Sequence, residues 1–347
     1  MRKIGVALSG GVDSSLTALL LRDQGYEVVA VTLKVQDEAE GESVCAGNLA
    51  VERAKKVAEH LGLEHVVCDV SREFRELILR PAQQEYAHAR TPSPCVRCNE
   101  RIKFGKLVPF VMELGCTHLA TGHYAKVVRY QGKSCVARGA DENKDQSYFL
   151  AGLPSHLLDH VMFPLGTFHK TEVRALADTY GLPSAKVADS QNVCITRPGK
   201  TFAETLWELF GAEAVRGQFV VDGRPAACHL GLHHYTVGQR HGLGNLAPTK
   251  PVWVRRVGPV NVEVTTDRTQ LDVTYAEADG LHWNVESVPQ RCSVQIRYRH
   301  KPVMASVEVV GDTAKVRMDA PVHAVTPGQA LVFYDGNVVL GRGWIKS

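Results

Sequence analysis

The sequence predicts an α/β fold in which an N-terminal, doubly wound parallel sheet is followed by a small central domain and a C-terminal β-barrel. Two observations carry this prediction. Short strand-like runs alternate with amphipathic stretches over the first part of the chain, and short alternating runs between Gly, Pro and Asp turns fill the last third. The length of 347 residues also exceeds a single hydrophobic core, which rarely grows beyond about 250 to 300 residues. We therefore expect three domains, at residues 1–200, 201–260 and 261–347.

The N-terminal elements follow from changes in the hydrophobic period along the chain. Short apolar runs predict strands, and stretches with apolar residues three and four positions apart predict helices. Because strands and helices alternate, we expect the strands to be parallel, with helices on both faces of the sheet. The predicted strands are residues 3–8, 27–33, 65–70 and 117–121, and the predicted helices are residues 14–22, 48–61, 72–89 and 99–114.

The last third of the chain is predicted to be rich in β-strands. One more amphipathic segment, residues 202–210, precedes it. Turn signals such as Asp222-Gly223 and Asp335-Gly336 then separate short alternating runs, a pattern typical of a small barrel or sandwich. The runs are VWVRRV, VEVTT, SVQIRYR, ASVEVV, AKVRM and ALVFYDG.

The composition is that of an ordinary globular protein, with 44% hydrophobic and 22% charged residues. No apolar run approaches the roughly 20 residues that cross a bilayer, and residues 1–8 resemble a strand instead of a signal peptide, so we expect no membrane contact and a cytoplasmic location. A net charge of +3 allows a nucleic-acid partner without requiring one. Nine cysteines without a secretory signal favour free thiols, metal sites or catalysis over a disulfide framework.

A glycine-rich loop, Ser9-Gly10-Gly11-Val12-Asp13-Ser14-Ser15, connects the first predicted strand to the first predicted helix. Its glycines allow backbone amides to approach a phosphate, its serines add donors, and the helix N-terminus adds positive potential. The loop lacks the spacing and the lysine of a Walker loop, and the GxGxxG pattern is absent. It therefore suits binding of a released pyrophosphate; the alternative is a glycine-rich turn before a well-capped helix.

Two cysteines lie in a proline-rich segment that leads into a predicted helix, Thr91-Pro92-Ser93-Pro94-Cys95-Val96-Arg97-Cys98-Asn99. The helix N-terminus and the nearby Arg97 and Arg101 predict a lowered pKa for the Cys98 thiol. Half a zinc site is the alternative, but no second C-x-x-C or Cys/His pair completes it. Cys194 lies in another loop-like stretch, where functional residues are common. The other cysteines are expected to be small buried hydrophobes or incidental surface residues: Cys45, Cys68, Cys116, Cys135, Cys228 and Cys292.

The glycine-rich loop and the two cysteine segments together resemble the bacterial tRNA-specific 2-thiouridylases of the PP-loop ATP pyrophosphatase superfamily. The resemblance runs over nearly the whole chain. The further stretches that agree are Thr121-Gly122-His123-Tyr124-Ala125, Lys144-Asp145-Gln146-Ser147-Tyr148-Phe149-Leu150, Tyr235-Thr236-Val237-Gly238-Gln239-Arg240, Ile296-Arg297-Tyr298-Arg299 and Val325-Thr326-Pro327-Gly328-Gln329.

The resemblance implies ATP and Mg²⁺ as cofactors and the wobble uridine of the tRNAs for Lys, Glu and Gln as substrate. It implies Cys98, Cys194 and Asp13 as catalytic residues. The residues implied for ATP are Ala7, Leu8, Ser9, Gly10, Gly11, Val12, Asp13, Ser14, Leu33 and Gly122. Those implied for the target base and the rest of the tRNA are Ser93, Pro94, Cys95, His123, Lys144, Asp145, Gln146, Arg297, Tyr298 and Gln329.

By resemblance, the uridine O2 is adenylated, so that AMP becomes the leaving group, while Mg²⁺ and the loop amides neutralise the pyrophosphate. Cys194 then receives a persulfide sulfur from a sulfur-donor protein and attacks the activated carbon, and Cys98 releases that sulfur by forming a disulfide with Cys194. The sequence departs from the family at Cys95, where some members carry aspartate, and at Ile195-Thr196, where Phe-Ile is common. With Cys95, Cys98 and Cys194 together, a [4Fe-4S] cluster with one open iron position is an alternative that the sequence leaves open.

The implied tRNA contacts have weaker support from the residues alone. Arg297 and Tyr298 combine charge with a ring at a strand end, as RNA binding needs, but a charged strand edge has the same composition. His123 follows a parallel strand, where α/β sheets place ligands. The rival functions are a PP-loop amidating synthetase, which needs no cysteine pair, a thiolase for another uridine or for cytidine, and an RNA-binding protein with a degenerate nucleotide site, which the intact loop argues against.

Overall fold

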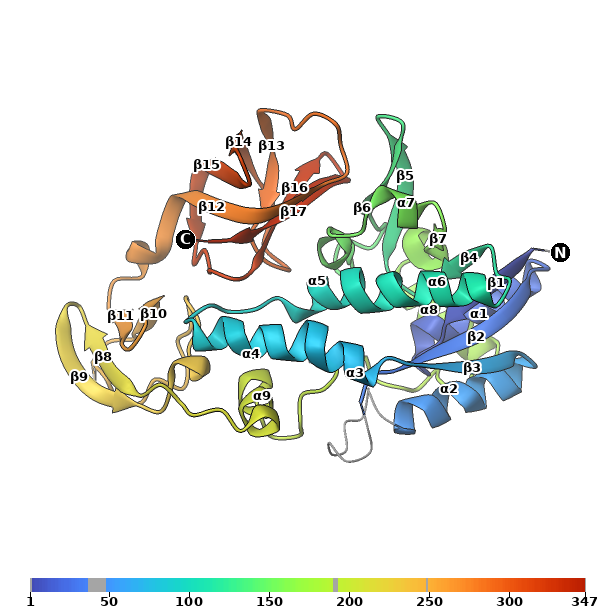
Figure 1. Cartoon of the computed structure of the whole chain (residues 1–347), viewed down its shortest axis with the longest axis horizontal. Helices are drawn as coiled ribbons and strands as arrows, with labels where there is room; N and C mark the ends of the chain where they lie inside the picture. The colour runs from blue at the N-terminus through green and yellow to red at the C-terminus, as the bar shows by residue number, and fades with distance from the viewer. Residues whose placement is uncertain (1, 37–47, 190–192, 248, 347) are drawn as a thin grey trace.

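The computed structural model describes residues 2–36, 48–189, 193–247 and 249–346. Figure 1 shows an N-terminal sheet with its helices at one end of the molecule, a small sheet at the other end, and a C-terminal barrel above the long helices between them. Within the described ranges, none of the helices has the length and apolar character needed to cross a membrane.

The N-terminal sheet is parallel throughout, which confirms the prediction of a doubly wound sheet. Alternate residues of one central strand pack into two different cores, Val29 and Val31 on one face and Val28 and Ala30 on the other, so both faces are covered. The strand order is β3-β2-β1-β4-β7, with β1 at Lys3–Ala7, β2 at Glu27–Lys34, β3 at Glu64–Asp69, β4 at His118–Ala120 and β7 at Val161–Met162.

Helices on the two faces differ in regularity. One face carries α1 (Val12–Asp23), α2 (Asn48–Leu61) and α8 (Lys170–Thr179), which supply apolar residues to one core. The other core receives residues from two long helical runs that each contain a π-helical turn. The first run is α3 (Ser71–Phe74), η2 (Arg75–Leu79) and α4 (Arg80–Ala87), and the second is α5 (Pro94–Cys98), η3 (Asn99–Phe104) and α6 (Gly105–Glu113).

The second helical run begins five residues earlier than predicted, at Pro94. Proline suits the first helical position because its missing N–H has no partner there in any case. Cys95 and Cys98 therefore lie on a helix, and Cys98 is its last α-helical residue before the π-helical turn.

A hairpin that the sequence reading did not identify, β5 (Ala125–Tyr130) and β6 (Lys133–Arg138), joins the N-terminal part of the chain to the barrel. Its Ala137 pairs with Val338 of the last barrel strand. The hairpin thus belongs to the first 200 residues in sequence and to the C-terminal sheet in space.

The central region begins with α9 (Phe202–Phe210), as predicted. Thr201 and Glu204 form a capping box at its start, and Gly211 ends it in the left-handed conformation with φ +60°. The sheet that follows has the order β10-β11-β8-β9. Its strands are β8 (Gly217–Val221), β9 (Arg224–His229), β10 (Trp253–Val257) and β11 (Val262–Thr265), so the last central strand lies beyond the expected boundary at residue 260.

The C-terminal domain is a closed, six-stranded antiparallel barrel, as the alternating runs predicted. Pairing of its first strand with its last closes the sheet, and alternation along β14 and β15 turns one set of side chains into the barrel core. The strands are β12 (Asp272–Trp283), β13 (Arg291–Gln295), β14 (Val303–Val310), β15 (Thr313–His323), β16 (Ala330–Asp335) and β17 (Val338–Ile345). The remaining short helices are η4 (Ser147–Leu150), α7 (Ser155–Leu158), η5 (Pro164–Thr167), η6 (Leu232–His234) and η7 (Arg268–Leu271).

Candidate active site

The glycine-rich loop places an open helix N-terminus at the carboxyl end of β1. Gly11 is the N-cap of α1 and provides no side-chain cap, and the first helical bond runs from the Ser15 amide to the Gly11 carbonyl at 3.1 Å. The amides of Val12, Asp13 and Ser14 therefore have no acceptor within the helix. With the positive end of the helix dipole, they form the kind of site that binds phosphate groups.

Two glycines of the predicted ATP site are required by close backbone contacts. Gly10 has φ +74°, and a Cβ added there would lie 2.6 Å from the Cβ of Arg53. A Cβ on Gly122 would lie 2.8 Å from the Asp13 carbonyl carbon, so the residues after β4 lie directly against the first turn of α1. The other residues expected at ATP lie along the same sheet edge. Ala7 ends β1 and Leu8 follows it, Leu33 lies near the end of β2, and the Ser9 amide donates to the Ser14 hydroxyl at 3.2 Å.

The Asp13 carboxylate binds a lysine that the sequence reading did not identify. Lys170, the first residue of α8, places its ammonium nitrogen 2.7 and 2.8 Å from the two Asp13 oxygens. The Tyr124 hydroxyl donates to the same carboxylate at 2.7 Å. Burial and the neighbouring Asp13 raise the pKa of Tyr124 far above its ordinary value, so this phenol stays a donor. No local pattern marks Lys170, which lies 157 residues from its partner.

A second carboxylate extends this charge network towards the Cys194 segment. Asp189 accepts from Lys144 at 2.9 Å, from Lys170 at 3.0 Å and from Arg174 at 2.6 Å. Burial alone would raise the pKa of Asp189, but the hydrogen bonds from Lys144 and Lys170 outweigh it and lower this pKa to about 2. The residue five positions before Cys194 is thus tied to the ammonium group that also holds Asp13.

The prediction of a lowered pKa for Cys98 is wrong. Burial raises the pKa of this thiol to about 11. The two arginines expected to lower it face other groups: Arg97 lies 3.7 Å from Glu85, and Arg101 lies 3.2 Å from Glu100. Because the helix begins at Pro94, Cys98 is also a full turn away from the helix N-terminus.

Lys103 is the cation that acts on this cysteine pair, and the sequence reading did not identify it. Its charge and its backbone hydrogen bond oppose the effect of burial on the pKa of Cys98, and its charge does the same for Cys95, whose pKa burial also raises. Lys103 lies five residues after Cys98 in the π-helical turn η3 and is exposed, whereas both of its chain neighbours, Ile102 and Phe104, are buried. π-Helical turns are frequent at functional sites.

Cys98 and Cys194 are partly buried and pack against the same hydrophobic core, which includes Val96 and Ile195. Among the residues that the structure describes, no three His, Cys, Asp or Glu side chains are grouped so that they could hold a metal ion. Cys95, Cys98 and Cys194 therefore do not form a cluster site in this arrangement. The expectation of small buried hydrophobes holds for Cys68, Cys116, Cys135 and Cys292, whereas Cys228 is exposed and Cys45 lies outside the described residues.

Several residues expected to contact tRNA have polar groups bound within the protein. Nδ1 of His123 lies 2.7 Å from the Thr121 hydroxyl, and the ring packs near two phenylalanines; burial lowers the pKa of His123 well below its ordinary value. Asp145 is buried and binds Arg138 at 2.9 Å, and the Gln146 side chain accepts from the Tyr124 amide at 3.0 Å. With Lys144 bound to Asp189, these side chains support the site from within.

The barrel side of the predicted tRNA contacts is more open. Tyr298 is half-buried and packs against Phe149 with ring centres 4.3 Å apart and ring planes tilted by 39°, and Arg297 beside it is also half-buried. Gln329 differs, because its amide nitrogen donates to two carbonyls, that of Thr91 at 3.1 Å and that of Pro92 at 2.8 Å. Ser93 and Pro94, expected at the target base, are buried.

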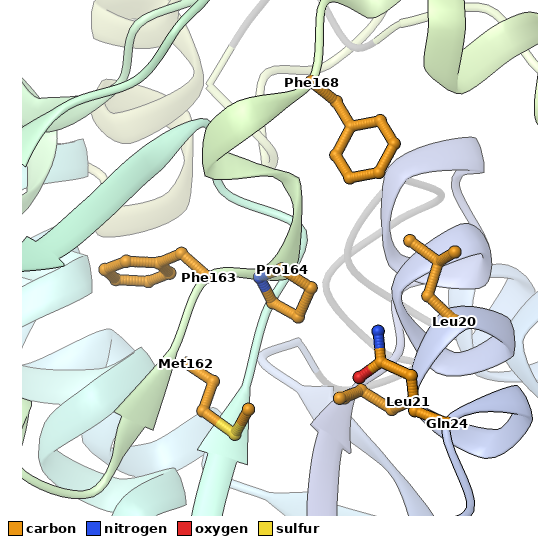
Figure 2. Close-up of a pocket in the computed structure, with 7 residues that line it drawn as sticks. All are labelled: Leu20, Leu21, Gln24, Met162, Phe163, Pro164 and Phe168. Carbon is orange, nitrogen blue, oxygen red and sulfur yellow. The ribbon is translucent and has the colours of Figure 1, made fainter.

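An apolar pocket of about 230 Å³ lies at the other end of α1 (Figure 2). The helix rises 1.5 Å per residue, so Leu20 is about 12 Å from the phosphate-binding end. None of the described residues that line the pocket is titratable, and we assign the pocket no part in the chemistry. Its lining residues are Leu20, Leu21, Gln24, Met162, Phe163, Pro164 and Phe168.

Comparison with known proteins matches both ends of the chain to family models. Residues 2–198 match the model described as "tRNA methyl transferase HUP domain", and residues 272–345 match the "Aminomethyltransferase beta-barrel domain". A protein of Geobacter metallireducens named tRNA-specific 2-thiouridylase MnmA is 41% identical over 366 residues, covering 100% of this chain and 97% of the relative. A protein of the same name from Carboxydothermus hydrogenoformans is 41% identical over 360 residues, covering 100% and 98%.

Likeness to solved structures is weaker. The structure titled "U34-tRNA thiolase NcsA from Methanococcus maripaludis with its [4Fe-4S] cluster" has 19% identity and a TM-score of 0.37, covering 60% of this chain and 65% of that one. A likeness of this degree has no bearing on the chemistry of this chain.

Proposed function

The chain belongs to the tRNA-specific 2-thiouridylase family, and we propose that it uses ATP to replace the O2 of the wobble uridine in tRNA by sulfur. The observation that carries the proposal is that a chain 41% identical to such relatives over its full length keeps an open phosphate-binding helix end and both expected cysteines, Cys98 and Cys194, on one core. The tRNAs for Lys, Glu and Gln are the expected substrates, and the cytoplasm is the expected location.

ATP would bind with its phosphates at the amides of residues 12–14. The phosphate loop has no lysine of its own. The ammonium group of Lys170 would supply this positive charge, because its bond to Asp13 holds it next to the loop. Mg²⁺ usually binds through one or two carboxylates together with substrate phosphates, and Asp13, whose side chain is one-third exposed, fits that part. When bound, Mg²⁺ would neutralise charge on the departing pyrophosphate.

Adenylation of the uridine O2 converts a poor leaving oxygen into AMP. The loop amides are fixed by the fold before the reaction, so they stabilise the pyrophosphate without rearranging. Tyr124 and Lys170 hold the Asp13 carboxylate in one orientation at the same place. The protein thus contributes positioned charge and hydrogen bonds to this step.

Sulfur transfer would use the two cysteines in turn. The terminal sulfur of a Cys194 persulfide, loaded by a sulfur-donor protein, attacks C2 of the adenylated uridine, and AMP leaves with the former O2. The Cys98 thiolate then attacks the Cys194 sulfur. The S–S bond to the nucleotide breaks, 2-thiouridine is released, and a Cys98–Cys194 disulfide remains for a thiol reductant to reduce.

The raised pKa of Cys98 makes its thiolate rare in the free enzyme. With a pKa of about 11, roughly one molecule in 10⁴ is ionised at pH 7. A protected thiol is useful here, because a permanent thiolate near Cys194 would discharge the persulfide before the uridine is activated. Lys103 is the described cation that favours ionisation of this thiol.

The proposal is tested by assaying anaerobically purified protein with ATP, Mg²⁺, unmodified tRNA and either a persulfide donor or sulfide, with 2-thiouridine, AMP and pyrophosphate as products. We expect iron-free protein to thiolate with the persulfide donor, Cys194→Ser to lose thiolation, and Cys98→Ser to accumulate a tRNA–Cys194 adduct. Cys228→Ser, at an exposed cysteine, is the matched control and should keep activity.

Other outcomes have distinct meanings. Iron in the protein with sulfide-supported thiolation would assign Cys95, Cys98 and Cys194 to a cluster and replace the persulfide route. ATP-dependent addition of a nitrogen nucleophile would identify an amidating synthetase. No 2-thiouridine with either sulfur source would refute the proposed function.

A further inference from the structure

The cysteine segment is attached to the C-terminal barrel on its N-terminal side. The Thr91 amide donates to the Pro327 carbonyl at 2.8 Å, and the Gln329 side chain donates to the carbonyls of Thr91 and Pro92 at 3.1 and 2.8 Å. Arg90 reaches the carbonyl of Ile345 in the last barrel strand at 3.2 Å. Residues of the catalytic domain and the barrel that are more than 230 positions apart in sequence therefore meet directly before Cys95.

The barrel also holds the segment on its C-terminal side. Arg342 of β17 forms a 2.6 Å ion pair with Glu100, and both side chains are nearly buried, with 7% and 14% of their surface exposed. The guanidinium groups of Arg97 and Arg342 each lie 4.7 Å from the centre of the Trp344 ring. Cys95 and Cys98 thus lie between two sets of barrel contacts, as the placement of the barrel above α5 in Figure 1 allows.

The Gln329 side chain provides hydrogen-bond donors to residues 91–94, a stretch that has few of its own. Pro92 and Pro94 have no N–H, so this stretch has few donors of its own with which to fix its path. The Gln329 amide offers two N–H donors, and both are used on consecutive carbonyls. Directly beyond them is Ser93, the N-cap of α5, so the Gln329 side chain binds the two carbonyls immediately before the start of the helix with the two cysteines.

The turn that presents Gln329 is built for this close approach. Gly328 has φ +90°, and a Cβ added there would lie 2.7 Å from the Thr91 carbonyl oxygen. The backbone N–H of Gln329 donates to the Thr326 carbonyl at 3.2 Å, and this bond fixes the turn itself. A side chain at residue 328 would push the barrel away from the cysteine segment.

We infer that the barrel positions the cysteine segment and that Gln329 is a positioning residue, one that acts on sulfur transfer through the Cys95–Cys98 helix. Its side-chain nitrogen is bound to the two carbonyls directly before this helix, so its loss would affect the cysteine segment even without tRNA. The inference rests on the proposed function for its kinetic part.

The test compares Gln329→Met, which keeps the volume and removes both donors, with Gln329→Asn, which keeps the donors one methylene shorter. Gln270→Met, an exposed glutamine at the entrance to the barrel, is the matched control. Thiolation is measured at varied tRNA concentration, and Cys95 and Cys98 are alkylated with iodoacetamide in the folded protein and counted by mass spectrometry.

For Gln329→Met we expect kcat for thiolation to fall at least roughly tenfold, because displacement of a reacting group by about 1 Å can cost 10²-fold. The KM for tRNA should change less than about twofold, and alkylation of Cys98 should become faster because the segment opens, on the scale of at least threefold. Gln329→Asn should lie between Gln329→Met and the wild type, and Gln270→Met should match the wild type in every measurement.

A rise in the KM for tRNA with kcat and alkylation unchanged would overturn the inference and return Gln329 to the tRNA interface. Unchanged values throughout would overturn it as well. If Gln329→Met does not fold, Gln329→Asn gives the same two readings. Alkylation needs neither ATP nor tRNA, so it still tests the positioning role should the wild-type protein fail to thiolate, an outcome that would count only against the proposed function.

Discussion

Replacing Lys170 with methionine removes an ammonium group that Asp13 and Asp189 share. Its nitrogen lies 2.7 Å from an oxygen of the first carboxylate and 3.0 Å from an oxygen of the second, so the two oxygens are held within about 6 Å of each other. Their side chains are 33% and 23% exposed, and that of Lys170 is 10% exposed. At an effective dielectric constant of about 20, two like charges about 5 Å apart repel by about 3 kcal/mol.

Lys144 and Arg174 still neutralise part of the charge on Asp189, and solvent reaches Asp13, so we expect a net loss of about 2 kcal/mol in the opening free energy of the N-terminal sheet. Hydrogen exchange of the β1 and α1 amides measures that free energy locally. Lys55→Met is the control, because the Lys55–Glu59 pair is 3.9 Å apart and well exposed and should contribute less than about 0.5 kcal/mol.

A double-mutant cycle with Asp13→Asn decides whether the reasoning holds. Lys170→Met should cost much less once Asp13 is neutral, because the repulsion is then absent. If the free-energy changes of the two single mutants add up to that of the double mutant to within about 0.5 kcal/mol, the charge network is not the source of the loss.

The effect also depends on pH in a defined direction. The pKa of Asp189 is lowered from 3.8 to about 2 in the folded protein, so its stabilising contribution is present above pH 4 and is lost as the pH falls from about 4 to about 2. The difference between wild type and Lys170→Met should therefore shrink over that window.

The remaining predictions concern the cysteine segment, the phosphate loop and the barrel contact. Alkylation of Cys98 should speed up about tenfold per pH unit between pH 8 and pH 10, and Lys103→Met should slow it at each pH by raising the pKa further. Gly10→Ala should abolish ATP binding in calorimetry, because φ +74° and the 2.6 Å contact both oppose a Cβ. Glu100→Gln should lower stability by about 3 kcal/mol because it leaves Arg342 buried without its counter-charge, whereas the same change in an Arg342→Met background should cost far less.

The sequence by itself determined those features that depend only on residues close together in the chain, namely the regular secondary structure and the phosphate loop. Hydrophobic periods of two and of 3.6 residues located four of the five parallel strands, α2 at residues 48–61 and α9 at residues 202–210, because side-chain direction in strands and helices repeats with those periods. The short fifth strand, β7, was not predicted. The phosphate loop was readable for the same reason, since the loop and the helix end that bind an anion are one continuous stretch of chain.

The tertiary structure alone decided which distant groups meet and what surrounds them. Lys170 and Asp13 are 157 residues apart, and Gln329 and Thr91 are 238 residues apart, and no local spacing encodes such contacts. The pKa of Cys98 was mispredicted because nearby arginines are visible in the sequence, whereas burial, which dominates, depends on how several elements pack around one thiol. Local sequence patterns thus predicted a phosphate-binding loop and candidate cysteines, and packing decided the charge and position of the groups around them.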